Sequence, residues 1–366
     1  MVEEAHVNHA RLHPQLLESD AATGGLSFGK YTADLGWASK PYPLIFWTDF
    51  LASSSAGYAL IYWSSNLPLF SWSQVGAVLL AAICMFRACM FMHEAVHSGK
   101  EIPGFTTAFN LYFGFVNKLP LYIYDVHRAH HLQEYYGTEE DSEYELLKRD
   151  LPNLLIPIVV TALQPGLMIL RFGVLPWFLP FIGERVRNAV YQRASTFALN
   201  RHYRRPLPDA AERGKWYWQD AACAFCHLVF VVLCITGVLS WNLLWAWYAV
   251  AVVTMLANYY RVMSSHAYWT GFSPTTRKQQ ILDSLTVTGS PWLCWLYPVG
   301  LRYHALHHMM PHVPYHHMAK VHRILLSRLP DDHPYRETIV DGFLQAYRRL
   351  PTAAVLEPDS KVLQPQ

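Results

Sequence analysis

Apolar residues are concentrated in long stretches of this 366-residue chain, separated by polar segments. A bilayer crossing needs about 20 mostly apolar residues, and four stretches meet that requirement. The first and second are joined by a short connector without charged residues, as are the third and fourth. The pattern therefore predicts two transmembrane hairpins, with spans at about residues 42–63, 75–92, 221–241 and 243–260.

A further apolar stretch, residues 151–182, contains five prolines. Because proline lacks the backbone N–H and clashes with the preceding helical turn, we expect interfacial or re-entrant helices here. The predicted fold class is all-α: an integral membrane protein with four transmembrane helices in two hairpins, a cytosolic helical cap and interfacial helices. The predicted division is a polar cytosolic N-terminal segment at 1–40, a membrane domain at 41–350 and a C-terminal tail at 351–366.

Basic residues indicate which side of the membrane these elements face. Residues 184–215, between the second and third predicted spans, carry eight of them. Cytoplasmic loops are enriched in lysine and arginine, so we expect this loop, both termini and the polar cap on the cytoplasmic side. The eight are Arg185, Arg187, Arg193, Arg201, Arg204, Arg205, Arg213 and Lys215.

The composition agrees with a membrane base that carries a polar cap. Hydrophobic residues make up 52% of the chain and charged residues only 15%, against about 25% in soluble proteins. The six cysteines lie in or beside apolar stretches, which argues against a disulfide framework. The Cys223-Ala-Phe-Cys226 spacing is interpreted as apolar packing instead of a redox or zinc motif. The first forty residues lack the basic and apolar regions of a cleavable signal.

Three short motifs repeat histidine at helical spacing. Residues 93–97 read His-Glu-Ala-Val-His, residues 127–131 read His-Arg-Ala-His-His and residues 304–308 read His-Ala-Leu-His-His. In a helix, residues i, i+3 and i+4 share one face, so each motif presents two or three imidazoles in one direction. Eight converging imidazoles exceed the four ligands of a tetrahedral zinc, and we expect them to hold two metal ions. His266, six residues after the fourth predicted span, is a ninth candidate.

Other residues near these motifs are weaker candidates. His312, His316 and His317 follow the third motif, and we expect them to support the site or line a substrate channel, with direct ligation as the alternative. Carboxylates near the motifs could accept hydrogen bonds from imidazole N–H groups or be solvated surface charges: Glu94, Asp125, Glu134, Glu140, Asp141 and Asp283. The remaining histidines are interpreted as polar side chains without a metal role: His6, His9, His13, His202, His227, His322 and His333.

Imidazole binds zinc, copper, iron and nickel, so the ligand type alone leaves the metal open. The three motifs, in this order and set in a four-span pattern, resemble the membrane fatty acid desaturase superfamily, and the resemblance covers about residues 41–326. It implies a non-haem di-iron centre at the cytosolic face, which uses O₂ to remove two hydrogens from a fatty acyl chain and form a C=C bond. The iron ligands that it implies are His93, His97, His127, His130, His131, His266, His304, His307 and His308.

One position departs from the pattern of that superfamily. In its best-understood members an asparagine one turn before the extra histidine supports a water at the metal. Val262 occupies the matching position here, and the nearest asparagine is Asn258. The asparagine that supports this water is therefore missing at the matching position of this chain.

Electrons for O₂ chemistry must come from another protein. The sequence has no GxGxxG nucleotide motif, no four-cysteine iron–sulfur pattern and no fused haem segment. We expect a separate donor, a ferredoxin or a small cytochrome with its reductase, which the basic cytosolic face could dock. The expected substrate is a fatty acyl lipid or acyl carrier within membrane lipid, and no nucleic acid partner is expected.

The same residues allow two alternatives to desaturation to be compared with it. The same di-iron scaffold could hydroxylate or ketolate a lipid or carotenoid, since both reactions begin with hydrogen abstraction. A metal transporter is the second alternative, but it needs ionisable residues inside the spans. Asp49, Arg87 and His227 are expected to be isolated there, which argues against transport.

Overall fold

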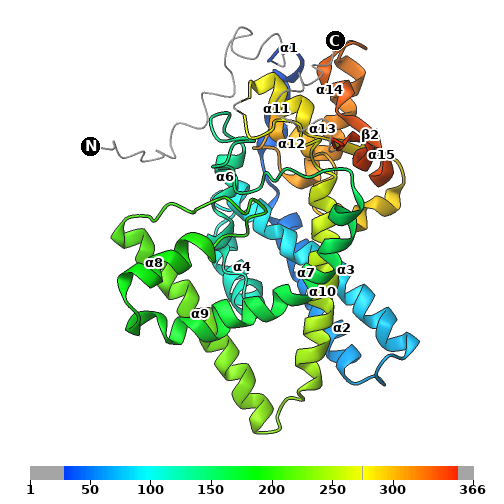
Figure 1. Cartoon of the computed structure of the whole chain (residues 1–366). Coiled ribbons are helices and arrows are strands. Elements are labelled where there is room, and N and C mark those ends of the chain that lie inside the picture. Colours follow the sequence, from blue (N-terminus) through cyan, green and yellow to red (C-terminus); the bar gives the residue numbers. More distant parts are fainter. Residues whose placement is uncertain (1–28, 274, 353–366) are drawn as a thin grey trace.

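The computed structural model describes residues 29–273 and 275–352 of the chain. Within these residues the fold is built mostly of helices, with one small parallel sheet of two short strands. Figure 1 shows long helices in the lower half and a cluster of shorter elements above them. Most of the 1–40 segment, including His6, His9 and His13, and nearly all of the 351–366 tail lie outside the described residues. The domain division therefore stays a prediction.

Four long helices correspond to the two predicted hairpins. α2 (Pro43–Ser65) packs along α3 (Trp72–Ser98), and α9 (Ala210–Ile235) leads through a short turn into α10 (Asn242–Met263). Both turns lie toward the lower end of the molecule in Figure 1. α10 also contacts α2 and α3, so the hairpins share one core. Each of the four helices is long and apolar enough to cross a membrane.

The helix that contains most of the third predicted span has other limits than residues 221–241, because α9 begins eleven residues before residue 221 and ends at Ile235. The Asp209 side chain starts the helix by accepting a hydrogen bond from the backbone N–H of Glu212. Gly237, just after the helix, has a φ of 75°, a conformation that favours glycine and ends helices. The first turns of α9 are polar, so hydropathy alone does not include them.

The proline-rich stretch forms one helix followed by irregular turns. α7 (Leu151–Met168) contains Pro157 and Pro165, and a π-helical turn, η6 (Ile169–Val174), continues it. α7 packs against α10, and η6 packs against α9. Residues Leu151–Trp177 are also long and apolar enough to cross a membrane, so the described residues contain five candidate spans where four were predicted.

The positions of the histidine motifs restrict how often the chain can cross the membrane, and so whether this fifth candidate is a span. Residues 127–131 and 304–308 contribute to the same two histidine groups, so the chain between them must cross the membrane an even number of times. The predicted arrangement, in which α9 and α10 cross and α7 lies in or at the surface of the membrane, meets this requirement. The number of crossings stays a prediction.

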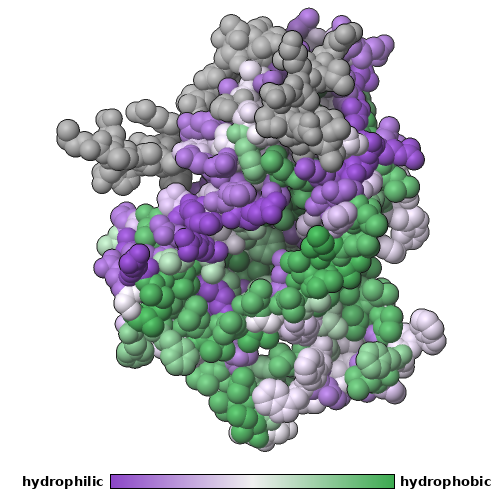
Figure 2. Space-filling view, viewed as in Figure 1, coloured by the Kyte–Doolittle hydropathy of each residue, from purple (hydrophilic) through white to green (hydrophobic). Residues whose placement is uncertain are grey.

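The surface is divided into an apolar and a polar part. Figure 2 shows hydrophobic residues over most of the lower half and a hydrophilic band above it. Soluble monomers rarely expose large contiguous apolar patches, so this lower half is suited to lipid, as in a multi-pass membrane protein. The large apolar side chains that it exposes include Leu163 and Leu167 of α7, Phe225 of α9 and Trp245 of α10.

Two charged residues inside the first hairpin form a pair. Arg87 Nε donates a hydrogen bond to Asp49 Oδ1 at 2.6 Å, and the Tyr315 hydroxyl donates to Asp49 Oδ2 at 2.7 Å. The prediction that Asp49 and Arg87 are isolated is therefore wrong. The pair neutralises two charges in apolar surroundings and ties α2 and α3 to α13 (Tyr315–Arg328).

Shorter elements form the cap and the connections. β1 (Thr286–Thr288) and β2 (Ile339–Asp341) pair in parallel, which departs from the all-α prediction because three-residue strands give no periodic signal. The other helices are α1 (Gly29–Thr32), η3 (Leu35–Ser39), α4 (Phe105–Phe109), η4 (Asn110–Gly114), α5 (Phe115–Asn117), η5 (Leu121–Tyr124), α6 (His127–His130), η7 (Leu175–Trp177), η8 (Leu179–Phe181), α8 (Glu184–Arg193), α11 (Arg277–Asp283), η9 (Pro291–Trp295), α12 (His304–Met309), α14 (Pro334–Glu337) and α15 (Gly342–Arg349).

Candidate metal centre

Three helix segments carry the histidine motifs to one place. The first motif forms the last turns of α3, the second forms α6 and its C-cap, and the third opens α12. His266 follows α10 in a non-helical segment, where it forms an isolated antiparallel bridge with Ser284. The structure brings all nine predicted histidines together, and they divide into two groups.

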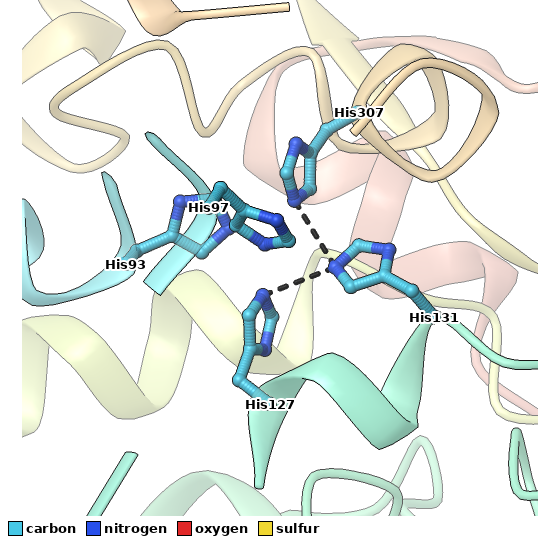
Figure 3. Close-up of side chains that lie close together, drawn as sticks. All are labelled: His93, His97, His127, His131 and His307. Carbon is cyan, nitrogen blue, oxygen red and sulfur yellow. Dashed lines mark hydrogen bonds between the residues drawn. The ribbon is translucent and has the colours of Figure 1, made fainter. Parts of the chain in front are cut away.

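The first group contains His93, His97, His127, His131 and His307. One ring nitrogen of each lies within 4.8 Å of the corresponding nitrogen of every other member. His131 Nε2 is 3.1 Å from His127 Nε2 and 3.1 Å from His307 Nε2, as the dashed lines in Figure 3 indicate. In Figure 3 the five rings surround one small space, into which each directs a ring edge.

The second group contains His130, His266, His304 and His308, all of them buried. His266 Nε2 is 3.3 Å from His130 Nε2 and 2.8 Å from His304 Nε2. His304 Nε2 is in turn 3.1 Å from His308 Nε2. The two groups adjoin each other, since the ring centroids of His131 and His308 are 4.5 Å apart.

These nitrogen positions fit the coordination of a metal ion. Two nitrogens that each lie about 2.1 Å from a metal, at roughly a right angle, are separated by about 3 Å. The Nε2 atoms of His93 and His97 are buried and have no hydrogen-bond partner, although buried polar atoms are nearly always satisfied. A metal ion in each group would satisfy such nitrogens. The donor set of nine imidazoles therefore fits two metal ions.

The electrostatics also favours neutral imidazoles, the form that binds metal. Burial, followed by the neighbouring His308 and His307 rings, holds the pKa of His131 well below its usual range. Burial has the same effect on the pKa of His266, His304 and His308. His130 differs: burial lowers the pKa of this imidazole, but the adjacent Asp141 carboxylate, with Glu143 and Asp283, raises it above its usual value.

Acidic and phenolic groups hold the outer nitrogens of three rings. His127 Nδ1 is 2.6 Å from Glu143 Oε1, and His130 Nδ1 is 2.8 Å from Asp141 Oδ2. His266 Nδ1 is 2.8 Å from the Tyr136 hydroxyl, which donates to Asp283 Oδ2 at 2.6 Å. Such contacts fix each ring so that Nε2 faces inward, and they make the imidazole a stronger ligand.

Burial raises the pKa of the Glu143 carboxyl to about 7 and that of Asp283 to about 6. Both acids lie close to the imidazole groups, so a bound cation would favour their ionised forms.

The predictions for the surrounding carboxylates are partly confirmed. Asp141 contacts His130 directly, Asp283 reaches His266 through Tyr136, and Glu94 Oε1 is 3.4 Å from His93 Nδ1. Asp125 is a wrong candidate, because it pairs with Arg205 at 2.7 Å. Glu134 and Glu140 are exposed, which agrees with the alternative that they are solvated surface charges.

Two contacts were missed by sequence reasoning. Glu143 stands close in sequence to the second motif, but it lies in a turn, where no regular periodicity places it beside His127. No local pattern in the sequence marks Tyr136 as part of the site, because its partners His266 and Asp283 are more than a hundred residues away.

The remaining histidines of the described chain lie outside both groups. His316 Nε2 accepts a hydrogen bond from the Tyr42 backbone N–H, and His317 Nε2 contacts the Lys40 carbonyl oxygen. His322 pairs with the Tyr335 hydroxyl at 2.6 Å. Others that stand apart from the two groups are His202, His227, His312 and His333.

An internal cavity leads to the first group. Its deeper part lies between α3, α7 and α10 and is lined almost wholly by apolar side chains, among them Met85 and Trp247. Its upper part is lined by His93, Tyr124, Glu143, Arg261 and Val262, among others. The two parts adjoin each other because they share the lining residues Cys89, Met90, Phe197 and Asn258.

Comparison with known proteins gives two matches that cover most of the chain. Residues 69–339 match the fatty acid desaturase family. Over 315 residues the chain is 31% identical to a ceramide hydroxylase of Caulobacter vibrioides (strain NA1000 / CB15N), an alignment that covers 84% of this chain and 88% of the relative. The region matched to the family contains all nine histidines.

Proposed function

Because the chain belongs to the fatty acid desaturase family, we propose that it is an O₂-dependent membrane oxidoreductase that hydroxylates a lipid acyl chain. The single observation that supports this most directly is an apolar cavity that ends at His93, beside two groups of buried imidazoles. Family and relative both point to an oxygen-dependent oxidoreductase, and the choice of hydroxylation rests on the ceramide hydroxylase.

The two histidine groups would hold two iron ions, one in each group. When bound and reduced, the iron supplies the activation of O₂ and the oxidising power that an unactivated C–H bond requires. The chain itself contributes the ligand geometry and the two carboxylates that hold the Nδ1 atoms of His127 and His130. The apolar lining of the cavity excludes water, which would otherwise compete with the substrate.

Hydroxylation and desaturation use the same inputs. In hydroxylation, R–H, O₂, two electrons and two protons give R–OH and water. In desaturation, the same inputs with a –CH₂–CH₂– unit give –CH=CH– and two waters. Desaturation is the second candidate because the family that the chain matches is named for it.

Lipid analysis of an expressing bacterial host tests the proposal. We expect the wild-type chain, supplied with its electron donor, to produce acyl lipids that carry one additional oxygen. A product that instead lacks two hydrogens would establish desaturation and contradict hydroxylation. If neither product formed while the protein was in the membrane with iron bound, the proposed function would be wrong.

The dimensions of the cavity give a second expectation. Ala251 lines the deep part of the cavity, so Ala251→Phe should fill it and reduce turnover of long acyl chains more than that of short ones. Ala249→Phe adds the same ring to α10 at a position outside the cavity lining and serves as the matched control. Product yield from lipids of graded chain length measures the difference. Equal losses for all lengths would contradict an acyl chain in this cavity.

Electron supply and orientation complete the proposal. A separate ferredoxin or small cytochrome would deliver the electrons. The site would face the cytoplasm, because arginine-rich segments such as residues 184–215 are typical of cytoplasmic loops. Within those residues Arg185, Arg193, Arg201 and Arg204 are exposed and could meet an acidic donor.

A further inference from the structure

A buried arginine lines the metal end of the cavity, and no carboxylate forms a hydrogen bond or a close ion pair with it. Glu143, which lines the same part of the cavity, interacts with it only through space. Arg261 is 6% exposed, and its Nε donates a hydrogen bond to Asn258 Oδ1 at 3.0 Å. Among the described residues no carboxylate lies within 4.0 Å of it, and neither its terminal nitrogens nor the Asn258 amide nitrogen donates a hydrogen bond. Six donor hydrogens beside the histidines are therefore available to a ligand, four on the terminal nitrogens of Arg261 and two on the Asn258 amide.

The other two buried arginines of the described chain show how unusual this is. Arg171 pairs with Asp220 at 3.0 Å, and Arg205 pairs with Asp125 at 2.7 Å. An unpaired buried charge is strongly unfavourable. Evolution can retain such a charge when the molecule that enters the cavity provides the missing acceptor.

The lining of the cavity indicates which kind of molecule carries that acceptor. Residues of α10 from Trp247 at the deep end to Val262 at the upper end line the cavity, so it runs alongside this helix. Its deep part offers almost no polar surface, which suits a hydrocarbon chain. The donors of Arg261 and Asn258 stand together at the other end, next to His93.

We propose that Arg261, assisted by Asn258, binds the carbonyl oxygen of the acyl substrate, so that the chain extends from the histidines along α10. This inference rests on the proposed function. It makes Arg261 a substrate-positioning residue, with a carbonyl of an acyl amide, an acyl ester or a free fatty acid as its ligand. The oxidised carbon is then fixed by its distance from the carbonyl.

The wild-type protein provides the first test. Three acyl amides that differ only in chain length are supplied, and tandem mass spectrometry locates the oxidised carbon in each product. We expect the same distance from the carbonyl in all three. A constant distance from the methyl end instead would overturn the assignment while leaving the proposed function intact. Matching esters and free acids show which carbonyl is accepted.

Binding to the purified iron-loaded protein provides a second test that needs no turnover. Arg261→Gln should weaken the binding of an acyl amide about tenfold or more, and leave the binding of an alkane of equal length unchanged. Arg261→Lys keeps the charge and should restore part of the difference. Equal effects of Arg261→Gln on both ligands, or none on either, would overturn the assignment.

The two tests separate the possible failures. A wild-type protein that binds the amide through Arg261 but forms no oxidised lipid contradicts the proposed function alone. If Arg261→Gln loses its iron or leaves the membrane fraction, the chain-length series on the wild type decides the assignment. If the role of Arg261 were purely structural, Arg261→Gln would lower the amount of folded protein, but the folded part would oxidise the same carbon as the wild type.

Discussion

Replacing His307 with alanine is expected to abolish lipid oxidation and to remove at least one of the two expected metal ions. His307 Nε2 lies 3.1 Å from His131 Nε2, and the ring also packs against His93 and His97, with centroids 4.4 and 4.6 Å away. Its loss removes one of the five imidazoles of the first group and opens one side of it, so we expect the metal ion there to be bound more weakly and to be lost during purification. Elemental analysis of the purified protein, together with product yield, measures both effects.

A matched histidine variant separates this effect from general damage. His316 lies outside both groups, although it follows the third motif closely in sequence. His316→Ala should therefore keep two metal ions and its product. If His307→Ala kept full metal content and activity, the assignment of the first group would be wrong. Loss of both ions in His316→Ala would show that the site extends further than the nine histidines.

Much of the candidate site could be predicted because its signal is local. In a helix, positions i, i+3 and i+4 lie on one face, so the spacing within His127-Arg-Ala-His130-His131 already shows that these rings point together. The hairpins could be predicted for the same reason, since length and hydropathy are properties of one segment. Nothing beyond the sequence of each segment is needed.

Contacts between distant segments could not be predicted. The Tyr136 hydroxyl meets His266 and Asp283 only once three parts of the chain have folded together. The pairing of Asp49 with Arg87 depends on the register of α2 against α3, which hydropathy does not fix. The free hydrogen-bond donors of Arg261 could not be predicted either, because a missing acceptor can be recognised only when the positions of all neighbouring residues are known.

The second large effect is expected from Asp141→Asn. Asp141 is fully buried and accepts a hydrogen bond from His130 Nδ1 at 2.8 Å. Asparagine can still accept that bond, but it lacks the negative charge that makes His130 a stronger ligand. Removing such a partner typically weakens metal binding about 10- to 100-fold. The rate of iron loss to a chelator should rise accordingly, and lipid oxidation should fall with it.

Glu140→Gln is the matched control for this prediction, because it neutralises the preceding residue, which is exposed and outside the histidine groups. We expect Glu140→Gln to retain iron as the wild type does. Asp141 also accepts backbone N–H groups from Gly137 and Glu143, so thermal unfolding of both variants must be compared. If Asp141→Asn lost stability but bound iron with unchanged affinity, the role of Asp141 would be to stabilise the surrounding loop and not to strengthen His130 as a ligand. Weaker iron binding at unchanged stability would place its effect on His130, through the charge that favours the Nδ1-protonated, metal-binding form of the ring.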